Sequence, residues 1–126
     1  MSNIARKLDE LGVKKSIFLG PTPQWTANLP KIFARQLWVT KPIRTYVGID
    51  IGILENNKKL KSEFKKSNTA EFFDVIDAFC DEKGCLTYTD YNNIKESLTS
   101  WDYGHLTPSA SKWLSKNNLI NKIVED

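Results

Sequence analysis

Two short apolar segments constrain the fold of this chain more than any other feature of its sequence. Residues 17–19 end at Gly20 and Pro21, and residues 72–76 lie much further along the chain. Short apolar runs of this kind are typical of strands that are buried in a parallel sheet. The long connection between them has room for helices. We therefore predict an α/β fold in which the two strands run parallel, with Asp77 at the carboxyl edge of the sheet.

Apolar residues recur at helical spacing in other segments, which are residues 3–13, 29–37, 53–64 and 108–120. Gly12 is a good helix stop, and Thr107 followed by Pro108 is a good helix start. Residues 85–89 add one doubtful, peripheral strand. Two convincing strands are fewer than the roughly four to six of a usual sheet. We therefore expect the chain to borrow surface from a partner or to be part of a larger domain.

Composition indicates a globular protein of one domain. The chain has 126 residues, 26% of them charged, and a net charge of +3, with much of the positive excess in residues 56–66. Such a run is usually a solvated helix face, and this one lacks the recognisable module of a nucleic-acid-binding protein. No apolar run is long enough for a transmembrane helix, and the charged amino terminus lacks the apolar centre of a signal peptide. We therefore expect no export signal in the chain as written.

Cys80 and Cys85 are the only cysteines. The residues between them include Gly84 and can form a turn that brings the two sulfur atoms together. Their spacing is not the redox spacing C-x-x-C, and there is no second cysteine pair for zinc. Outside the cytosol we expect a small structural disulfide, and in the cytosol we expect two reduced thiols. Both alternatives stay open at this point, because the sequence does not determine the compartment.

The only histidine lies in residues 100–114, which read SWDYGHLTPSASKWL. Asp102 stands three residues before His105, so the two side chains reach the same side of a turn. A carboxylate on one imidazole nitrogen leaves the other nitrogen available to take a proton from a serine. The structural alternative is that Asp102 caps a turn and His105 packs under Trp101. The motif alone does not decide between these two interpretations.

The segment around His105 resembles the last block of the SGNH hydrolases, also called GDSL esterases, which is Asp-x-x-His ahead of a C-terminal helix. It is more similar still to one subgroup, the SGNH domains fused to membrane O-acyltransferases that acetylate bacterial surface polysaccharides. Two further motifs occur in the right order, and the resemblance extends from about residue 11 to about residue 119. They are the Cys…Gly-Cys-Leu segment at Cys80, Gly84, Cys85 and Leu86, and the Gly-Pro-x-Pro-x-Trp loop at Gly20, Pro21, Pro23 and Trp25.

The resemblance implies a partial three-layer α/β/α domain of the flavodoxin-like SGNH type. Residues 1–126 would be a single domain that is the C-terminal portion of the SGNH domain, with the first strands missing. The family's Gly-Asp-Ser block and its oxyanion-hole blocks do not occur in the chain. The resemblance therefore implies that His105 is the general base and acid, that Asp102 orients it, and that the serine lies outside this sequence. No metal ion or organic cofactor is implied, because Ser-His-Asp acyl transfer needs none.

No serine of the chain is expected to replace the missing nucleophile. Ser16 begins a strand, which is the wrong end for a site at the carboxyl edge of a parallel sheet. Ser100 does not lie on a nucleophile elbow, and Ser109 and Ser111 belong to the helix that follows His105. We therefore expect the chain to be inactive alone.

The proline loop is expected to form the edge of the substrate site. Pro23, Gln24 and Trp25 are the candidate substrate-binding residues, because flat aromatic rings suit the faces of sugars. Trp38 is expected in the core. A different class of function stays open, in which the domain is a non-catalytic remnant that binds a glycan or a protein through this loop.

The implied partners follow from the same resemblance. They are an acylated carbohydrate as substrate, the missing amino-terminal half or a second chain, and a membrane only through a fused domain. A homodimer is a further expectation, and nucleic acid is not expected. A fused form would be periplasmic, whereas a chain that is complete as written would be cytoplasmic.

Overall fold

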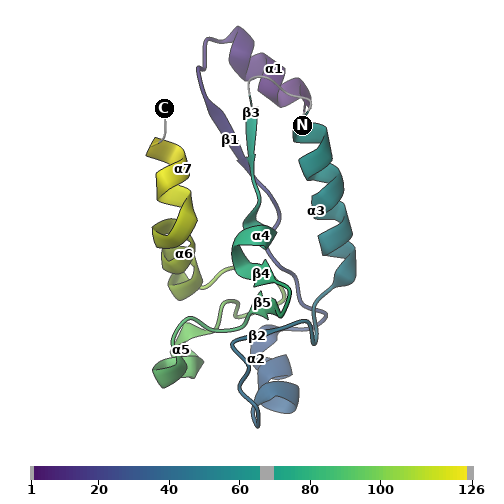
Figure 1. The fold of residues 1–126 in the computed structure, drawn as a ribbon, viewed down its shortest axis with the longest axis vertical. Coiled ribbons are helices and arrows are strands. Elements are labelled where there is room, and N and C mark those ends of the chain that lie inside the picture. Colours follow the sequence, from purple (N-terminus) through teal and green to yellow (C-terminus); the bar gives the residue numbers. More distant parts are fainter. Residues whose placement is uncertain (1, 66–69, 125–126) are drawn as a thin grey trace.

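The computed structural model describes residues 2–65 and 70–124 (Figure 1). In chain order its elements are α1 (Ser2–Glu10), β1 (Ser16–Leu19), α2 (Leu29–Ile32), a π-helical segment (Phe33–Leu37), β2 (Arg44–Thr45), α3 (Ile51–Phe64), β3 (Ala70–Phe73), α4 (Val75–Phe79), β4 (Cys80–Asp81), β5 (Gly84–Leu86), a 3-10 turn (Tyr91–Asn93), α5 (Ile94–Ser97), α6 (Pro108–Leu114), a second π-helical segment (Ser115–Leu119) and α7 (Ile120–Val124). The helices predicted from apolar spacing are therefore confirmed. No helix in residues 2–65 and 70–124 is long and apolar enough to cross a membrane.

The predicted parallel sheet is present, and it is short. β1 pairs in parallel with β3, so that Ile17 lies opposite Glu71 and Leu19 opposite Phe73. The two strands lie between α3 on one side and α6 with α7 on the other (Figure 1). This arrangement confirms the α/β fold class with helices on both faces of a parallel pair.

Side chains alternate along the strands and bury both faces of the pair. Phe18 and Phe72 pack with Phe64 of α3, whereas Ile17 and Phe73 pack in the cluster that contains Ala110 and Leu114 of α6. This period of two is the expected consequence of strand geometry. The prediction that both strands are buried is only partly correct, because Leu19 at the end of β1 is 52% exposed.

The second predicted strand is shorter than expected. β3 ends at Phe73, and residues 75 and 76 lie in α4 rather than in the strand. Asp74 ends the strand because its side chain accepts a hydrogen bond from the Asp77 N–H at 2.9 Å and so caps α4. Consequently Asp74, and not Asp77, lies at the carboxyl end of the parallel pair. A short apolar run does not distinguish strand from helix, which is why the sequence misplaced this boundary.

A second, antiparallel sheet has the order β2-β5-β4. Residues 85 and 86 were expected in a peripheral strand, but β5 is the middle strand of this sheet and all its residues are buried. Gly84 adopts φ +125°, and any side chain at this position would collide with the Thr45 carbonyl. The close approach of β2 therefore requires glycine here.

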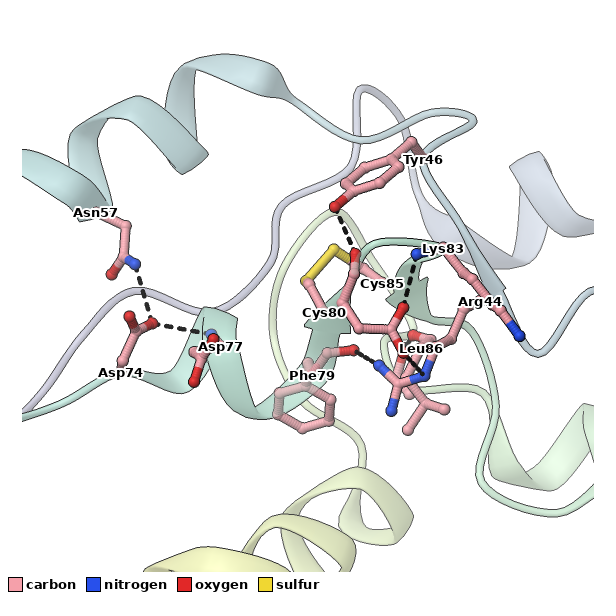
Figure 2. Close-up of a disulfide and its surroundings, with 12 residues drawn as sticks. Arg44, Tyr46, Asn57, Asp74, Asp77, Phe79, Cys80, Lys83, Cys85 and Leu86 are labelled. Atoms are coloured by element: carbon pink, nitrogen blue, oxygen red, sulfur yellow. Dashed lines mark hydrogen bonds and ion pairs between the residues drawn. A yellow bond between two sulfur atoms is a disulfide. The ribbon is translucent and has the colours of Figure 1, made fainter.

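Cys80 and Cys85 lie opposite each other in the β4–β5 hairpin and are joined by a disulfide (Figure 2). Arg44 of β2 donates a hydrogen bond to the Phe79 carbonyl at 2.5 Å, and its Nε lies 3.3 Å from Asp81. The hydroxyl of Tyr46 donates to the Asp81 carbonyl at 2.6 Å. These contacts attach the hairpin to β2 and the segment that follows it.

Candidate functional site

Residues 100–106 form a closed loop, called here the Asp–His loop, that places Asp102 beside His105. An antiparallel bridge between Ser100 and Leu106 closes the base of the loop. Asp102 Oδ1 accepts hydrogen bonds from the N–H groups of Gly104 and His105, each at 2.8 Å. The second carboxylate oxygen, Oδ2, lies 2.5 Å from His105 Nδ1. Both predicted side chains are therefore in direct contact.

The electrostatics of the loop favour an ionised Asp102. Hydrogen bonds from the backbone N–H groups of Gly104 and His105 are the main reasons that the pKa of the Asp102 carboxyl lies well below its usual range. An ionised carboxylate on Nδ1 favours the tautomer in which Nδ1 carries the proton. Nε2 is then the ring nitrogen that can exchange a proton, and the His105 side chain is 71% exposed. The structural alternative, in which His105 packs under Trp101, does not fit this exposure.

Ser100 supports the loop from beneath. The residue is 2% exposed, and its hydroxyl donates to the His105 carbonyl at 2.9 Å. The same oxygen lies 3.2 Å from Asp102 Oδ1 and accepts a hydrogen bond from the Asp102 N–H at 3.3 Å. The Ser100 hydroxyl therefore contacts both Asp102 and His105, and it is not available as a nucleophile.

The proline loop, residues 20–28, is attached to the Asp–His loop by hydrogen bonds. The Thr22 hydroxyl donates to the Gly104 carbonyl at 2.7 Å, and the Trp25 N–H donates to the Tyr103 carbonyl at 2.7 Å. A Cβ on Gly104 would lie 3.1 Å from Gln24 Cγ, which is closer than ordinary van der Waals contact. Two motifs that are far apart in the sequence thus form one structural unit, in which glycine allows the close approach.

The positions predicted for the tryptophans are reversed in the structure. Trp25 is 4% exposed and belongs to a buried cluster with Leu29 and Phe33, so its ring is not at the surface as expected. Trp38, which was expected in the core, is 57% exposed. Trp25 pairs with Ile49 through a backbone bridge, and this pairing turns its ring inward. Amphipathic tryptophans carry no sequence signal that separates these two outcomes.

The two other candidates of the proline loop differ in exposure. Pro23 is buried, and Gln24 is half-buried with its side chain over Gly104. Gln24 is therefore the candidate that lies beside the Asp–His loop. Its carbonyl also accepts a hydrogen bond from the Asp50 N–H at 2.8 Å, which holds the loop against the start of α3.

In the part of the chain that the structure describes, no serine is hydrogen-bonded to the His105 imidazole. Ser16 begins β1, and Ser111 is exposed on α6. The Ser109 hydroxyl is bonded to the Thr89 hydroxyl at 2.7 Å. Likewise, no cluster of metal-ligating side chains occurs among the described residues.

A polar network that the sequence does not predict lies at the carboxyl end of β3. Asp74 accepts a hydrogen bond from Asn57 at 2.9 Å (Figure 2). It also accepts one from Lys61 at 3.1 Å. Burial raises the pKa of Asp74, but the hydrogen bonds from Asp77, Asn57 and Lys61 together lower it below its ordinary value. The sequence signal of this network is an asparagine and a lysine spaced four residues apart, ahead of a strand that is followed directly by an aspartate.

Comparisons with known proteins agree with the geometry. A family model described as "SGNH domain (fused to AT3 domains)" matches residues 1–117. A similar solved structure is the periplasmic domain of a lipopolysaccharide acetyltransferase from Salmonella ser. Paratyphi A, which is 32% identical with a TM-score of 0.84. The match covers 97% of this chain and 46% of that chain, so the chain spans about half the length of its structural relative. No curated protein matches the chain at a significant level.

Proposed function

Because this chain belongs to the family of SGNH domains that are fused to AT3 domains, we propose that it is the C-terminal portion of a domain that transfers or removes acyl groups on a surface carbohydrate. The relative of about twice the length supports this division of the domain. The sequence contains no Gly-Asp-Ser block, so the nucleophilic serine is supplied by another segment or another chain. Residues 1–126 contribute the base and its orienting carboxylate.

The observation that carries the proposal is the contact between Asp102 Oδ2 and His105 Nδ1 at 2.5 Å. Asp102 keeps the proton on Nδ1, so that Nε2 accepts the proton of the serine hydroxyl as the serine oxygen attacks the acyl carbon. The bond from the acyl carbon to its leaving oxygen then breaks, and Nε2 returns the proton to that oxygen. Deacylation repeats these steps with the acceptor hydroxyl, or with water, in place of the serine.

The proposed acceptor class comes from the relative, whose name describes it as a lipopolysaccharide acetyltransferase. An acylated surface carbohydrate is accordingly the proposed substrate of this chain's complete domain. The proposed membrane partner is an AT3 domain in the same polypeptide or in the same complex. Gln24, which lies over Gly104 beside His105, is the proline-loop residue proposed to contact the substrate.

A chimera tests this function directly. The part of the Salmonella acetyltransferase that matches residues 1–117 is replaced by those residues, and lipopolysaccharide acetylation is measured in cells that lack the native enzyme. We expect the chimera to restore acetylation, and we expect His105→Ala and Asp102→Asn to lower it by about a hundredfold or more. Ser111→Ala, an exposed change on α6, is the matched control and should leave acetylation unchanged. An active chimera that tolerates His105→Ala would contradict the proposal.

A further inference from the structure

We propose that a groove between Trp38 and Tyr91 binds an anionic sugar residue of a glycan chain, separately from the Asp–His loop. The groove has a volume of about 380 Å³, and the residues that line it are Trp38, Lys41, Tyr91, Asn92, Asn93, Ile94 and Lys95. We call it the aromatic groove. The choice of a glycan as its occupant rests on the proposed function, whereas the site itself rests on the contacts described below.

Two large aromatic rings are exposed at the aromatic groove, and each of them packs against a buried ring. Trp38 is 57% exposed and Tyr91 is 67% exposed. The buried ring of Phe33 packs edge-on against Trp38 at 6.3 Å, and the buried ring of Tyr88 packs against Tyr91 at 6.3 Å. Phe33 and Tyr88 also contact each other at 6.0 Å. The two exposed rings therefore pack against the same pair of buried rings, and a flat ring supported in this way suits the apolar face of a sugar.

Lys41 places a positive charge in the aromatic groove at a conformational cost. It has φ +46°, a left-handed conformation that glycine or asparagine usually occupies after a helix. The position is held by the Lys41 N–H, which donates to the Leu37 carbonyl at 2.8 Å, and by the Tyr88 hydroxyl, which donates to the Lys41 carbonyl at 2.7 Å. Its ammonium lies 4.6 Å from the centre of the Trp38 ring. Lysine at this position places a cation beside the Trp38 ring, whereas glycine would place none there.

The charge of the aromatic groove selects the class of sugar. Lys41 and Lys95 are the charged residues that line it, and no acidic residue does. Asp90 is close in sequence, but it caps the turn at Asn92 and does not line the groove. The side-chain amides of Asn92 and Asn93 supply both donors and acceptors for hydroxyl groups. A ring with a carboxylate or another anionic substituent therefore fits this lining better than a neutral ring does.

NMR titration of the full chain with two oligosaccharides tests the proposal. The probes are tetragalacturonate, which is anionic, and maltotetraose, which is neutral. We expect saturable shifts at the Trp38 indole N–H and at the backbone amides of residues 91–95, with tetragalacturonate bound at least about threefold more tightly. Trp38→Ala and Tyr91→Ala should each weaken tetragalacturonate binding by about fivefold or more.

Two further variants make the result decisive. Lys41→Gly keeps the left-handed conformation and removes the cation, so the fold should persist while the preference for tetragalacturonate is lost. Trp101→Ala is the matched control, because Trp101 is 58% exposed but lies outside the aromatic groove. The absence of shifts with either probe, equal affinity for both probes, or an equal loss in Trp101→Ala would each overturn the proposal. Binding is measured without acyl transfer, so an inactive chimera would count against the proposed function and leave this result intact.

Discussion

At the scale of single residues, one carboxylate organises the candidate site. Asp102 uses one oxygen to accept two backbone N–H groups and the other to contact the imidazole of His105. The same side chain thus shapes the loop and orients the base. Asp102 has enough lone pairs both to cap the turn and to contact the imidazole, so these two contacts are compatible. The acid–base role of the pair stays a prediction.

Asp102→Asn is expected to change the tautomer of His105. In the wild type the carboxylate accepts the Nδ1 proton, so we expect the Nδ1–H tautomer to predominate in the neutral ring. The asparagine amide can present its NH₂ group to Nδ1, which favours the proton on Nε2. Two-dimensional NMR of the ring nitrogens measures this directly. A wild-type ring with its proton on Nε2 would show that the pair does not work as proposed.

Acid unfolding reports the same contact independently. The pKa of Asp102 is lower in the folded chain than its unfolded value of about 3.9, so the unfolded state binds the proton first as the pH falls. The stabilisation from ionised Asp102 is therefore complete above about pH 5 and is lost progressively below about pH 4. Urea unfolding at several pH values should show the stability difference between wild type and Asp102→Asn shrinking below pH 4. Asp74, whose pKa is also lowered, is present in both proteins, so its contribution cancels in their difference in stability. A stability difference that does not vary with pH would contradict the assignment.

Ser100→Ala tests the support beneath the loop. Removing this buried hydroxyl leaves the His105 carbonyl without its donor, and we expect a loss of about 1–2 kcal/mol in the free energy of unfolding. Ser111→Ala on the exposed surface of α6 should change it by no more than about 0.5 kcal/mol. Chemical denaturation of the three proteins provides the comparison. If both variants behaved alike, Ser100 would not be a structural support.

At the scale of elements, loops and a hairpin position the candidate site, and most regular elements other than α3 are short. The proline loop is bonded to Gly104 and Tyr103 in the Asp–His loop, and the β4–β5 hairpin is attached to β2 through Arg44 and Asp81. Short elements of this kind contribute few contacts of their own. Cross-links between them consequently matter more for stability than helix propensity does.

Reduction of the disulfide is expected to destabilise the chain modestly. Cys80 and Cys85 are five residues apart, and closing so short a loop removes little entropy from the unfolded chain, which gives about 2 kcal/mol. Urea unfolding with and without dithiothreitol measures the difference. The double variant Cys80→Ser with Cys85→Ser should match the reduced protein and be insensitive to dithiothreitol. A much larger loss would mean that the hairpin and its attachment to β2 unfold together.

At the scale of the whole molecule, the parallel pair β1–β3 is small for a sheet that is covered by helices on both faces. Parallel sheets are normally larger, and an isolated pair of strands is marginal. Leu19 at the carboxyl end of β1 is 52% exposed, although its segment has the composition of a buried strand. This mismatch, together with a relative of about twice the length, agrees with the proposal that more of the sheet is supplied from elsewhere.

The chain on its own is therefore expected to self-associate at micromolar concentration, because a strand edge with exposed apolar residues pairs readily with a second copy. Sedimentation velocity should detect a dimer or a larger species. Leu19→Lys should shift the population to monomer, since a charge at a strand edge opposes pairing. Val39→Lys is the control, because Val39 is 92% exposed and lies outside both sheets. A compact wild-type monomer would contradict this expectation.

The sequence by itself determined the local features of this protein. Apolar spacing with Gly12, Thr107 and Pro108 located the helices, and the three-residue separation of Asp102 and His105 brought those side chains together. Such features depend on interactions between residues that are close in the chain, and helix caps and turns follow from them directly. The resemblance to SGNH domains added the class of the fold, which the comparisons confirm.

Only the tertiary structure decided which side chains are buried and which loops meet. The proline loop around the buried Trp25 pairs with Ile49 and Tyr103, and these partners are distant in sequence. Residues 75 and 76 join a helix because the Asp74 cap replaces strand pairing, and β5 is central because β2 arrives from another part of the chain. In each case the deciding contact is long-range or competes with a local preference of similar size, so the residue pattern alone is satisfied by more than one arrangement.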